Sequence, residues 1–160
     1  RIIQKRIKGK KSMKSANKIT GNIGENLATE YLKNLGYEIL NDSQDSFTAR
    51  KDGKNIDVSR QNRNGKIQKG YDILVSDMEG EIEYIEVKSK KGNEKEFFKV
   101  SGLQWEFAKK LNEEGKGDKH YVYIVTNVRD KEKIAVTRMK NPYKAWLEGK
   151  LEVDPVRIKY

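Results

Sequence analysis

The chain has 160 residues, the size of a single domain with its own hydrophobic core; with 35% hydrophobic and 36% charged residues, that core is modest. It has no apolar run long enough to cross a bilayer and no signal-peptide pattern, which predicts a cytoplasmic protein that does not enter membranes. The lack of cysteine excludes disulfides and thiolate chemistry, and the single histidine, His120, argues against His-rich metal sites, so any divalent metal must bind oxygen ligands.

The net charge of +10 is concentrated at the N-terminus, where residues 1–24 carry eight basic residues and no acidic one. We predict a basic arm over residues 1–20, followed by one domain over residues 21–160. Such an arm suits a polyphosphate partner, because each neutralised phosphate releases condensed counterions. The alternative is a solvated, disordered tail. Because the chain begins with Arg1 and not Met, we expect it to be part of a longer protein.

The first predicted helix spans residues 22–35. Its apolar residues recur every four positions, which is typical of a helix with one buried face: Ile23, Leu27, Tyr31 and Leu35. Asn22 and Glu25 have the spacing of a capping box, and Gly36 is a typical stop.

Four segments follow in which strands are predicted, and the fold class depends on them. Residues 37–40 form a short strand, and residues 47–50 and 55–59 form a hairpin around Asp52-Gly53. After a basic loop over residues 60–69, the two strongest strands span residues 71–75 and 81–88, joined by a polar turn.

The second half of the chain contains another helix and further strands. Residues 101–112 form a helix that begins with a Ser101–Gln104 capping box. The β-branched run 121–126 is typical of a central strand, residues 133–138 form a further strand, and a short helix or loop ends the chain. Strands mixed with helices in one small domain predict an α/β fold with a mixed sheet flanked by helices.

The run Gly70-Tyr71-Asp72-Ile73-Leu74-Val75, followed by Tyr84-Ile85-Glu86-Val87-Lys88, carries the chemistry. Side chains alternate along a strand, so Tyr84, Glu86 and Lys88 share one face while Ile85 and Val87 share the other. Pairing of residue 76 with 82 would set Asp72 opposite Glu86; pairing of 76 with 80 would make them diagonal neighbours. A shift by one residue would separate them, so the register is decisive.

Two carboxylates and a lysine suit phosphodiester hydrolysis. A Mg²⁺ ion, or Mn²⁺, held by two carboxylates stabilises negative charge at phosphorus and lowers the pKa of bound water. Lys88 would position that water or stabilise the transition state. The alternative is a surface hairpin with an ordinary acid–lysine pair, but a carboxylate in an apolar strand is costly without a purpose.

These motifs resemble those of the PD-(D/E)xK nuclease superfamily, whose restriction-endonuclease-like core is helix, three strands, helix, strand. The resemblance runs from about Gly21 to Val128. More narrowly, the chain is similar to the branch named after the plant protein NO VEIN, found as C-terminal domains in bacterial restriction-like and defence proteins. The segments that carry this resemblance are Gly24-Glu25, Gly70-Tyr71-Asp72-Ile73, Tyr84-Ile85-Glu86-Val87-Lys88 and Trp105-Glu106-x-Ala108.

The resemblance implies a site and a function. Asp72 and Glu86 would bind the metal, Lys88 would be catalytic, Glu25 would face the site from the first helix, and Gln104 would supply a polar group from the second. Glu25 and Gln104 also have simpler interpretations as helix-cap partners. The implied function is a Mg²⁺-dependent endonuclease acting on nucleic acid, with DNA preferred, in a restriction or antiphage defence protein.

Other basic residues are candidates for phosphate contact at the rim of the cleft. The candidates for nucleic-acid binding are Lys5, Arg6, Lys8, Lys10, Lys11, Arg60, Arg63, Lys66, Lys69, Lys90 and Lys91. One active site cuts one strand, so a double-strand cut would require a homodimer or two successive nicks. The rival interpretations are an inactive nucleic-acid-binding module and a protein-interaction domain of a larger machine.

Overall fold

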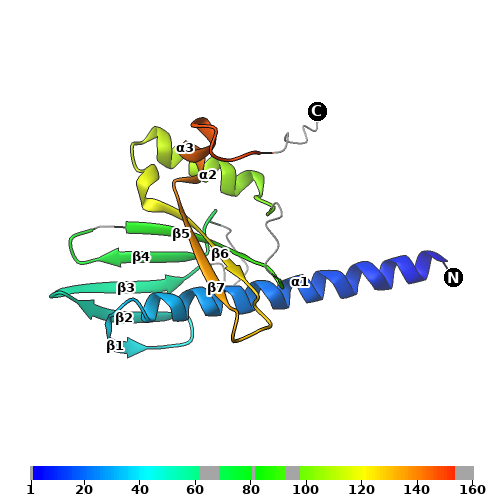
Figure 1. Ribbon diagram of the computed structural model, residues 1–160, viewed down its shortest axis with the longest axis horizontal. Coiled ribbons are helices and arrows are strands. Elements are labelled where there is room, and N and C mark those ends of the chain that lie inside the picture. Colours follow the sequence, from blue (N-terminus) through cyan, green and yellow to red (C-terminus); the bar gives the residue numbers. More distant parts are fainter. Residues whose placement is uncertain (1, 62–68, 81, 93–97, 154–160) are drawn as a thin grey trace.

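The structure is a computed structural model that describes residues 2–61, 69–80, 82–92 and 98–153, with the backbone alone described for residues 2–17 (Figure 1). It is a mixed α/β fold in which helices pack on a sheet of seven strands. The elements are α1 (Ile2–Lys33), β1 (Glu38–Asp42), β2 (Ser46–Lys51), β3 (Lys54–Arg60), β4 (Ile73–Asp77), β5 (Ile82–Ser89), α2 (Gly102–Glu113), the 3₁₀ helix η1 (Gly117–Lys119), β6 (His120–Thr126), β7 (Ala135–Lys140) and α3 (Pro142–Leu147).

The strands lie in the sheet in the same order as in the chain, from β1 to β7. Neighbouring strands are antiparallel except β5 and β6, which are parallel and are joined through α2. This arrangement follows from the connections, since short turns give antiparallel neighbours and a helical crossover allows a parallel pair. The predicted mixed sheet is therefore confirmed.

The predicted hairpin is confirmed between β2 and β3. Lys51 pairs with Lys54 across a two-residue turn in which Asp52 has φ 52° and Gly53 has φ 77°. Positive φ at both positions gives the turn that matches the strand twist. One boundary was wrong: β3 continues through Arg60, which pairs with Ile73 of β4, so Arg60 belongs to a strand and not to the basic loop.

The first helix differs most from its prediction. It runs without interruption from Ile2 to Lys33, so Asn22 lies inside it and the proposed Asn22–Glu25 cap does not exist. Lysine and arginine are good helix formers, which explains why a charged segment without apolar periodicity still continues the helix. Gly36, with φ 84°, follows the end of the helix as expected.

The buried face of α1 also differs, because small residues and not the large apolar ones lie at its centre. Its buried residues are Thr20, Gly24, Ala28 and Leu32, while the predicted stripe packs along its flank. A Cβ at Gly24 would collide with the side chain of Ser89, so α1 lies directly against the end of β5. The Ser89 hydroxyl donates a hydrogen bond of 3.0 Å to the Thr20 carbonyl at the same place.

The two main helices cover opposite faces of the sheet. Ile85 of β5 belongs to the core that includes Ala28 and Leu32 of α1. Tyr84 points the other way and packs on Phe107 of α2, with ring centroids 5.2 Å apart. The predicted second helix is confirmed, including both hydrogen bonds of its Ser101–Gln104 capping box. None of the helices in the described ranges is both long and apolar enough to cross a membrane.

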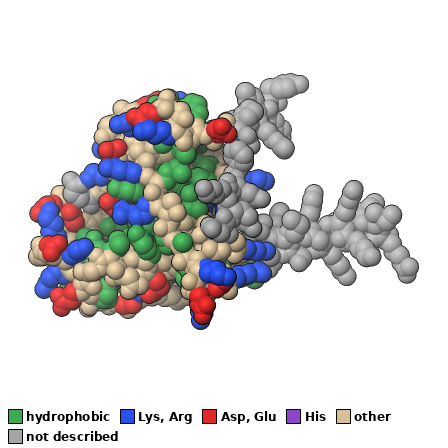
Figure 2. All heavy atoms as spheres, in the orientation of Figure 1, with side chains coloured by type: hydrophobic (Ala, Val, Ile, Leu, Met, Phe, Trp, Pro, Cys, Tyr) green, Lys and Arg blue, Asp and Glu red, His purple; other side chains and the backbone are tan. Residues whose placement is uncertain are grey.

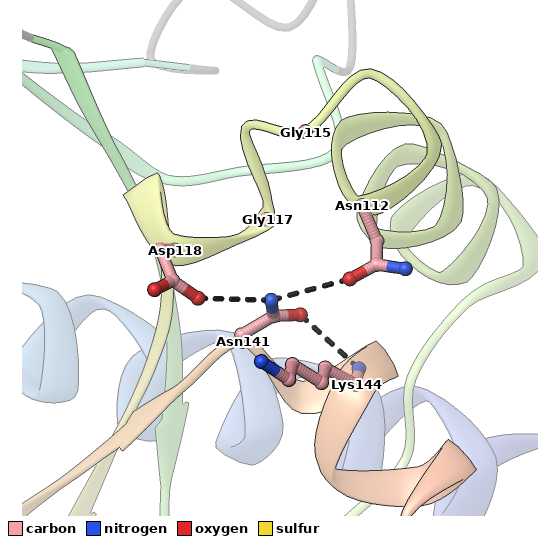
Figure 3. A pocket seen from close by; sticks show the side chains of 6 residues that line it. All are labelled: Asn112, Gly115, Gly117, Asp118, Asn141 and Lys144. Atoms are coloured by element: carbon pink, nitrogen blue, oxygen red, sulfur yellow. Dashed lines mark hydrogen bonds between the residues drawn. The ribbon is translucent and has the colours of Figure 1, made fainter.

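A polar junction fixes the C-terminal part of the fold (Figure 3). Asn141, buried and with φ 45°, donates hydrogen bonds to Asn112 and Asp118 and accepts one from the backbone N–H of Lys144. Gly117 lies so close that a side chain there would collide with Asn141. These residues line a small pocket, but their polar groups are used on one another, so we interpret the junction as structural: it joins the end of α2 to η1 and α3.

His120 makes the stability of this fold sensitive to acid. It is 3% exposed, packs edge-on against Phe107, and neither ring nitrogen has a hydrogen-bond partner among the described residues. Burial lowers the pKa of His120 to about 4. The unfolded chain therefore binds more protons than the folded one between pH 6.5 and 4, so this residue makes the fold less stable as the pH falls through that range.

We predict that His120→Phe removes this dependence. The free energy of unfolding of the variant minus that of the wild type should rise by up to about 1.4 kcal/mol for each unit by which the pH falls from 6.5 to 4. Urea unfolding at several pH values measures it, and above pH 7 the difference should be constant. A difference that does not change with pH would contradict the buried, neutral histidine.

Candidate active site

The register between β4 and β5 brings the two predicted carboxylates together. Ile73 pairs with Ile85 and Ser76 pairs with Ile82, which is the first of the two registers considered from the sequence. Asp72 lies immediately before β4, and its backbone N–H donates to the Ile85 carbonyl. Its carboxylate oxygen Oδ2 accepts a hydrogen bond of 2.8 Å from the Val87 N–H, so Asp72 is fixed beside Glu86.

Glu86 is the most perturbed acid of the site. It is 3% exposed, and burial, reinforced by the neighbouring Asp72 charge, raises the pKa of its carboxyl to about 8 although Lys88 opposes the change. A hydrogen bond with the Asp72 carboxylate also favours the protonated form. Glu86 Oε1 receives donors, while Oε2 is buried and receives no hydrogen bond from the described residues. Burial and the neighbouring Asp72 charge therefore favour the protonated form of Glu86 in the absence of a cation.

Lys88 and Gln104 complete the cluster. Lys88 Nζ lies 2.8 Å from Glu86 Oε1 and donates a hydrogen bond of 3.0 Å to Gln104 Oε1. Gln104 Nε2 donates to Glu86 Oε1 in a short hydrogen bond. The alternation predicted for β5 is thus confirmed, since Tyr84, Glu86 and Lys88 face α2.

An aromatic cluster borders the two acids, and the sequence did not single it out. The rings of Tyr71, Tyr84 and Phe107 lie with centroids 4.9–5.2 Å apart. Tyr71 precedes Asp72, and Tyr84 lies on the same face of β5 as Glu86, so this cluster adjoins the strand positions of both acids. The signal that the sequence offered for this cluster was Gly70. In the structure this glycine has φ 77°, and a Cβ there would collide with Phe107.

Glu25 lies on the other face of the sheet. The structure places its carboxylate against Arg60, with Nη2 to Oε2 at 2.9 Å, and Arg60 also donates a short hydrogen bond to Asn26. Because Arg60 pairs with Ile73, it shares the face of the core and α1. Glu25 therefore anchors α1 to β3, instead of joining Asp72 and Glu86 as the resemblance implied.

The same pair changes the interpretation of Arg60. Its side chain is 4% exposed and its guanidinium is engaged by α1, so it is placed as a buried structural cation and not as a phosphate contact at the rim. The sequence missed this because a basic residue before a basic loop is expected to be solvated. The extension of β3 through Arg60, which the sequence did not predict, is what places the Arg60 side chain on the core face.

The other predicted basic residues have different positions. Lys69 and Lys91 are exposed, and Lys69 donates a hydrogen bond to Gln61. Lys90 is half-buried just beyond the end of β5. Arg63 and Lys66 lie outside the described residues. Five candidates lie on the backbone of α1 where no side chains are described: Lys5, Arg6, Lys8, Lys10 and Lys11.

The carboxyl pair fits a hard divalent cation. Among the described residues no group of three His, Asp or Glu side chains could hold a metal ion, so the protein would supply Asp72 and Glu86 alone. Mg²⁺ usually keeps several waters and binds through one or two carboxylates. The raised pKa of Glu86 and its buried Oε2, which receives no hydrogen bond from the described residues, are consistent with a site that favours added positive charge.

Comparison with known proteins places this α/β domain. The profile of the family described as "Protein NO VEIN, C-terminal" matches residues 9–137, which include both carboxylates, Lys88 and Gln104. The chain belongs to this family. It is also 32% identical over 84 residues to "Protein NO VEIN" of Arabidopsis thaliana; the match covers 52% of this chain but 3% of that protein. No solved structure matches the chain.

The raised pKa of Glu86 predicts an unusual pH dependence of stability. Since the pKa of Glu86 is about 8 in the folded protein and near 4.5 when exposed, the folded state binds more protons between these values. Glu86 therefore destabilises the fold increasingly as the pH rises from 4.5 to 8. Glu86→Gln keeps the shape of the side chain without the charge. Its free energy of unfolding minus that of the wild type should therefore rise by up to about 1.4 kcal/mol for each unit by which the pH rises from 4.5 to 8.

Urea unfolding in EDTA at pH 5, 6, 7 and 8 measures this effect. Glu132→Gln, at an exposed position, is the control and should follow the wild type. Added Mg²⁺ should stabilise the wild type at pH 8 and not the Gln variant. A constant difference between Glu86→Gln and wild type would contradict a raised pKa of the buried Glu86 carboxyl.

Proposed function

We propose that this domain is a Mg²⁺-dependent endonuclease that hydrolyses phosphodiester bonds in nucleic acid, with DNA as the preferred substrate and Mn²⁺ as an alternative metal. The observation that carries the proposal is the placement of Asp72 beside Glu86 and Lys88 on neighbouring strands, next to a buried carboxylate oxygen that receives no hydrogen bond from the described residues. Defence against foreign DNA is the biological role that this activity suits.

The order of elements supports the same proposal. α1, the strands β3, β4 and β5, α2 and β6 follow one another as helix, three strands, helix, strand. This is the order of the PD-(D/E)xK core. In this interpretation β1, β2, β7 and α3 are additions at the edges of that core.

Each residue of the site then has a task. Asp72 and Glu86 would hold the cation, which supplies charge stabilisation at phosphorus and a more acidic bound water. Lys88 has three N–H donors, and among the described residues Glu86 and Gln104 accept from it; the third donor would serve a phosphate oxygen or the attacking water. The Tyr71, Tyr84 and Phe107 rings lower the local polarity and strengthen these interactions.

The basic N-terminal segment favours a nucleic-acid partner. Thr20 and Gly24 of α1 contact Ser89, one residue beyond Lys88, so the part of α1 before Thr20 leaves the body at the end of β5 that carries the site (Figure 1). Eighteen helical residues span roughly 27 Å at 1.5 Å each. The sequence of this segment has basic residues and no acid, which suits a run of phosphates.

We predict that Asp72→Ala and Glu86→Ala each reduce Mg²⁺-dependent cleavage of supercoiled plasmid by at least about 100-fold, because each loses a metal ligand. Lys88→Ala should lose turnover to a similar extent but keep Mn²⁺ binding by calorimetry. Glu132→Ala is the matched control at an exposed acid, and EDTA should abolish wild-type cleavage.

The cleavage products distinguish an enzyme that acts through single active sites from a homodimer. Nicked circles alone indicate single active sites, whereas direct linearisation indicates a homodimer that cuts both strands. Wild-type cleavage by Asp72→Ala would place the active site elsewhere. Nucleic-acid binding with no cleavage in any divalent metal would favour the inactive binding module.

We predict that deletion of residues 1–19 weakens DNA binding and flattens the slope of log affinity against log salt, at about 0.9 per lost phosphate contact on duplex DNA. Thr20 and the buried residues after it remain, so the domain should fold and still cut at high enzyme concentration. A Lys90→Gln, Lys91→Gln variant tests the rim separately. An unchanged affinity and slope after the deletion would show that the segment does not bind DNA.

A further inference from the structure

We infer that Gln104 is a positioning residue that fixes Glu86 and Lys88 to the first turn of α2. This inference rests on the proposed function and adds to it the part of the fold that holds the catalytic groups. A glutamine at this position also completes a helix cap, so the question is whether the cap accounts for all of its contacts.

The hydrogen bonds of Gln104 exceed those of a cap. Its Oε1 accepts from the Ser101 N–H at 2.9 Å, which is the cap bond, and from Lys88 Nζ at 3.0 Å. Two donors on Oε1 fix the orientation of the amide, so Nε2 points at Glu86 Oε1 and donates to it. A residue that served only the cap would need the first of these three bonds.

The effect on Glu86 is directional. Gln104 and Lys88 both donate to Oε1, whereas Oε2 receives no hydrogen bond from the described residues. The carboxyl is therefore held through one oxygen, and the other oxygen would remain available to a cation. Gln104 also accepts a hydrogen bond from Lys88 Nζ, so one amide contacts both the acid and the lysine of the site.

The chemistry of the side chain provides a selective test. Glutamine and glutamate serve equally at the third position of a capping box, because both offer an acceptor to the cap N–H. Only the amide also donates. Gln104→Glu therefore keeps the cap and the acceptor for Lys88 while removing the donor to Glu86. Gln104→Leu removes all three bonds, and Ser101→Ala removes the hydroxyl that accepts from the Gln104 backbone N–H while leaving the three hydrogen bonds of the Gln104 side chain.

The experiment compares these three variants with the wild type in three measurements: thermal unfolding, Mn²⁺ binding to the protein alone by calorimetry, and single-turnover cleavage of plasmid. Residues that orient metal ligands usually change metal affinity or activity by roughly 10–100-fold when replaced. We expect Gln104→Glu to unfold within a few degrees of wild type, to bind Mn²⁺ at least about threefold more tightly through its added carboxylate, and to turn over at least about tenfold more slowly.

The controls separate positioning from folding. Gln104→Leu should bind Mn²⁺ more weakly and cut at least about tenfold more slowly, with little change in the KM for DNA. Ser101→Ala should unfold roughly 2–4 °C lower than wild type yet keep its Mn²⁺ affinity and turnover. Cleavage and Mn²⁺ affinity unchanged in both Gln104 variants would overturn the inference and leave the nuclease intact.

The proposed function can fail separately. A wild-type protein that binds Mn²⁺ through Asp72 and Glu86 but cuts no DNA would remove the nuclease proposal, and the Mn²⁺ affinities of the Gln104 variants would still decide its positioning role. A loss of Mn²⁺ affinity in Ser101→Ala as large as in Gln104→Leu would assign the effect to the helix cap and overturn the inference.

Discussion

The pairing of β4 with β5 in one register is the constraint on which the site depends. Asp72 and Glu86 lie on the two arms of one hairpin, and a shift of one residue would move one of them to the core face. Ile73 and Ile85 prevent that shift, because both are fully buried against α1 and would have to exchange places with charged residues. The hydrophobic face thus holds the two acids in contact although their mutual repulsion opposes it.

That repulsion is balanced within the site and not by solvent. On the face drawn in Figure 2, acidic and basic side chains are interspersed, whereas Glu86 is buried. Burial of an acid beside another acid is unfavourable unless a cation or a proton compensates. Lys88 compensates in part, and the raised pKa of Glu86 favours a proton on its carboxyl. The site is therefore prepared for positive charge that the chain itself does not supply.

The sequence predicted the strands and their chemistry well for identifiable reasons. Alternation along residues 84–88 and the Asp52-Gly53 turn are local signals, and local signals place strands and turns. The start of α2 could also be predicted from the sequence, because a capping box is a contiguous pattern. These features needed no knowledge of distant contacts, and they include the register, which the turn restricted to two choices.

The features that the sequence did not predict all depend on distant partners. Glu25 looked like a cap residue or a site residue, and its actual partner, Arg60, lies 35 positions away on another strand. The centre of α1 could not be read from its large apolar residues, because the helix packs through Gly24, whose importance appears only beside Ser89. That the helix continues without a break before Asn22 could not be predicted either, since charged residues favour a helix whether or not it is buried.

The strand order has a consequence for how the domain is built during folding. Five strands from β1 to β5 form by successive local pairings, which is the kind of contact that a chain makes early. The parallel contact of β5 with β6 must wait for the crossover through α2, because the intervening chain has to loop back first. The two acids thus lie on strands that pair through local contacts. Gln104, which orients Glu86, lies on α2 in the crossover that must form before β5 can pair with β6. A folding intermediate that lacked α2 would already hold both acids, with one side of the carboxyl cluster open to water.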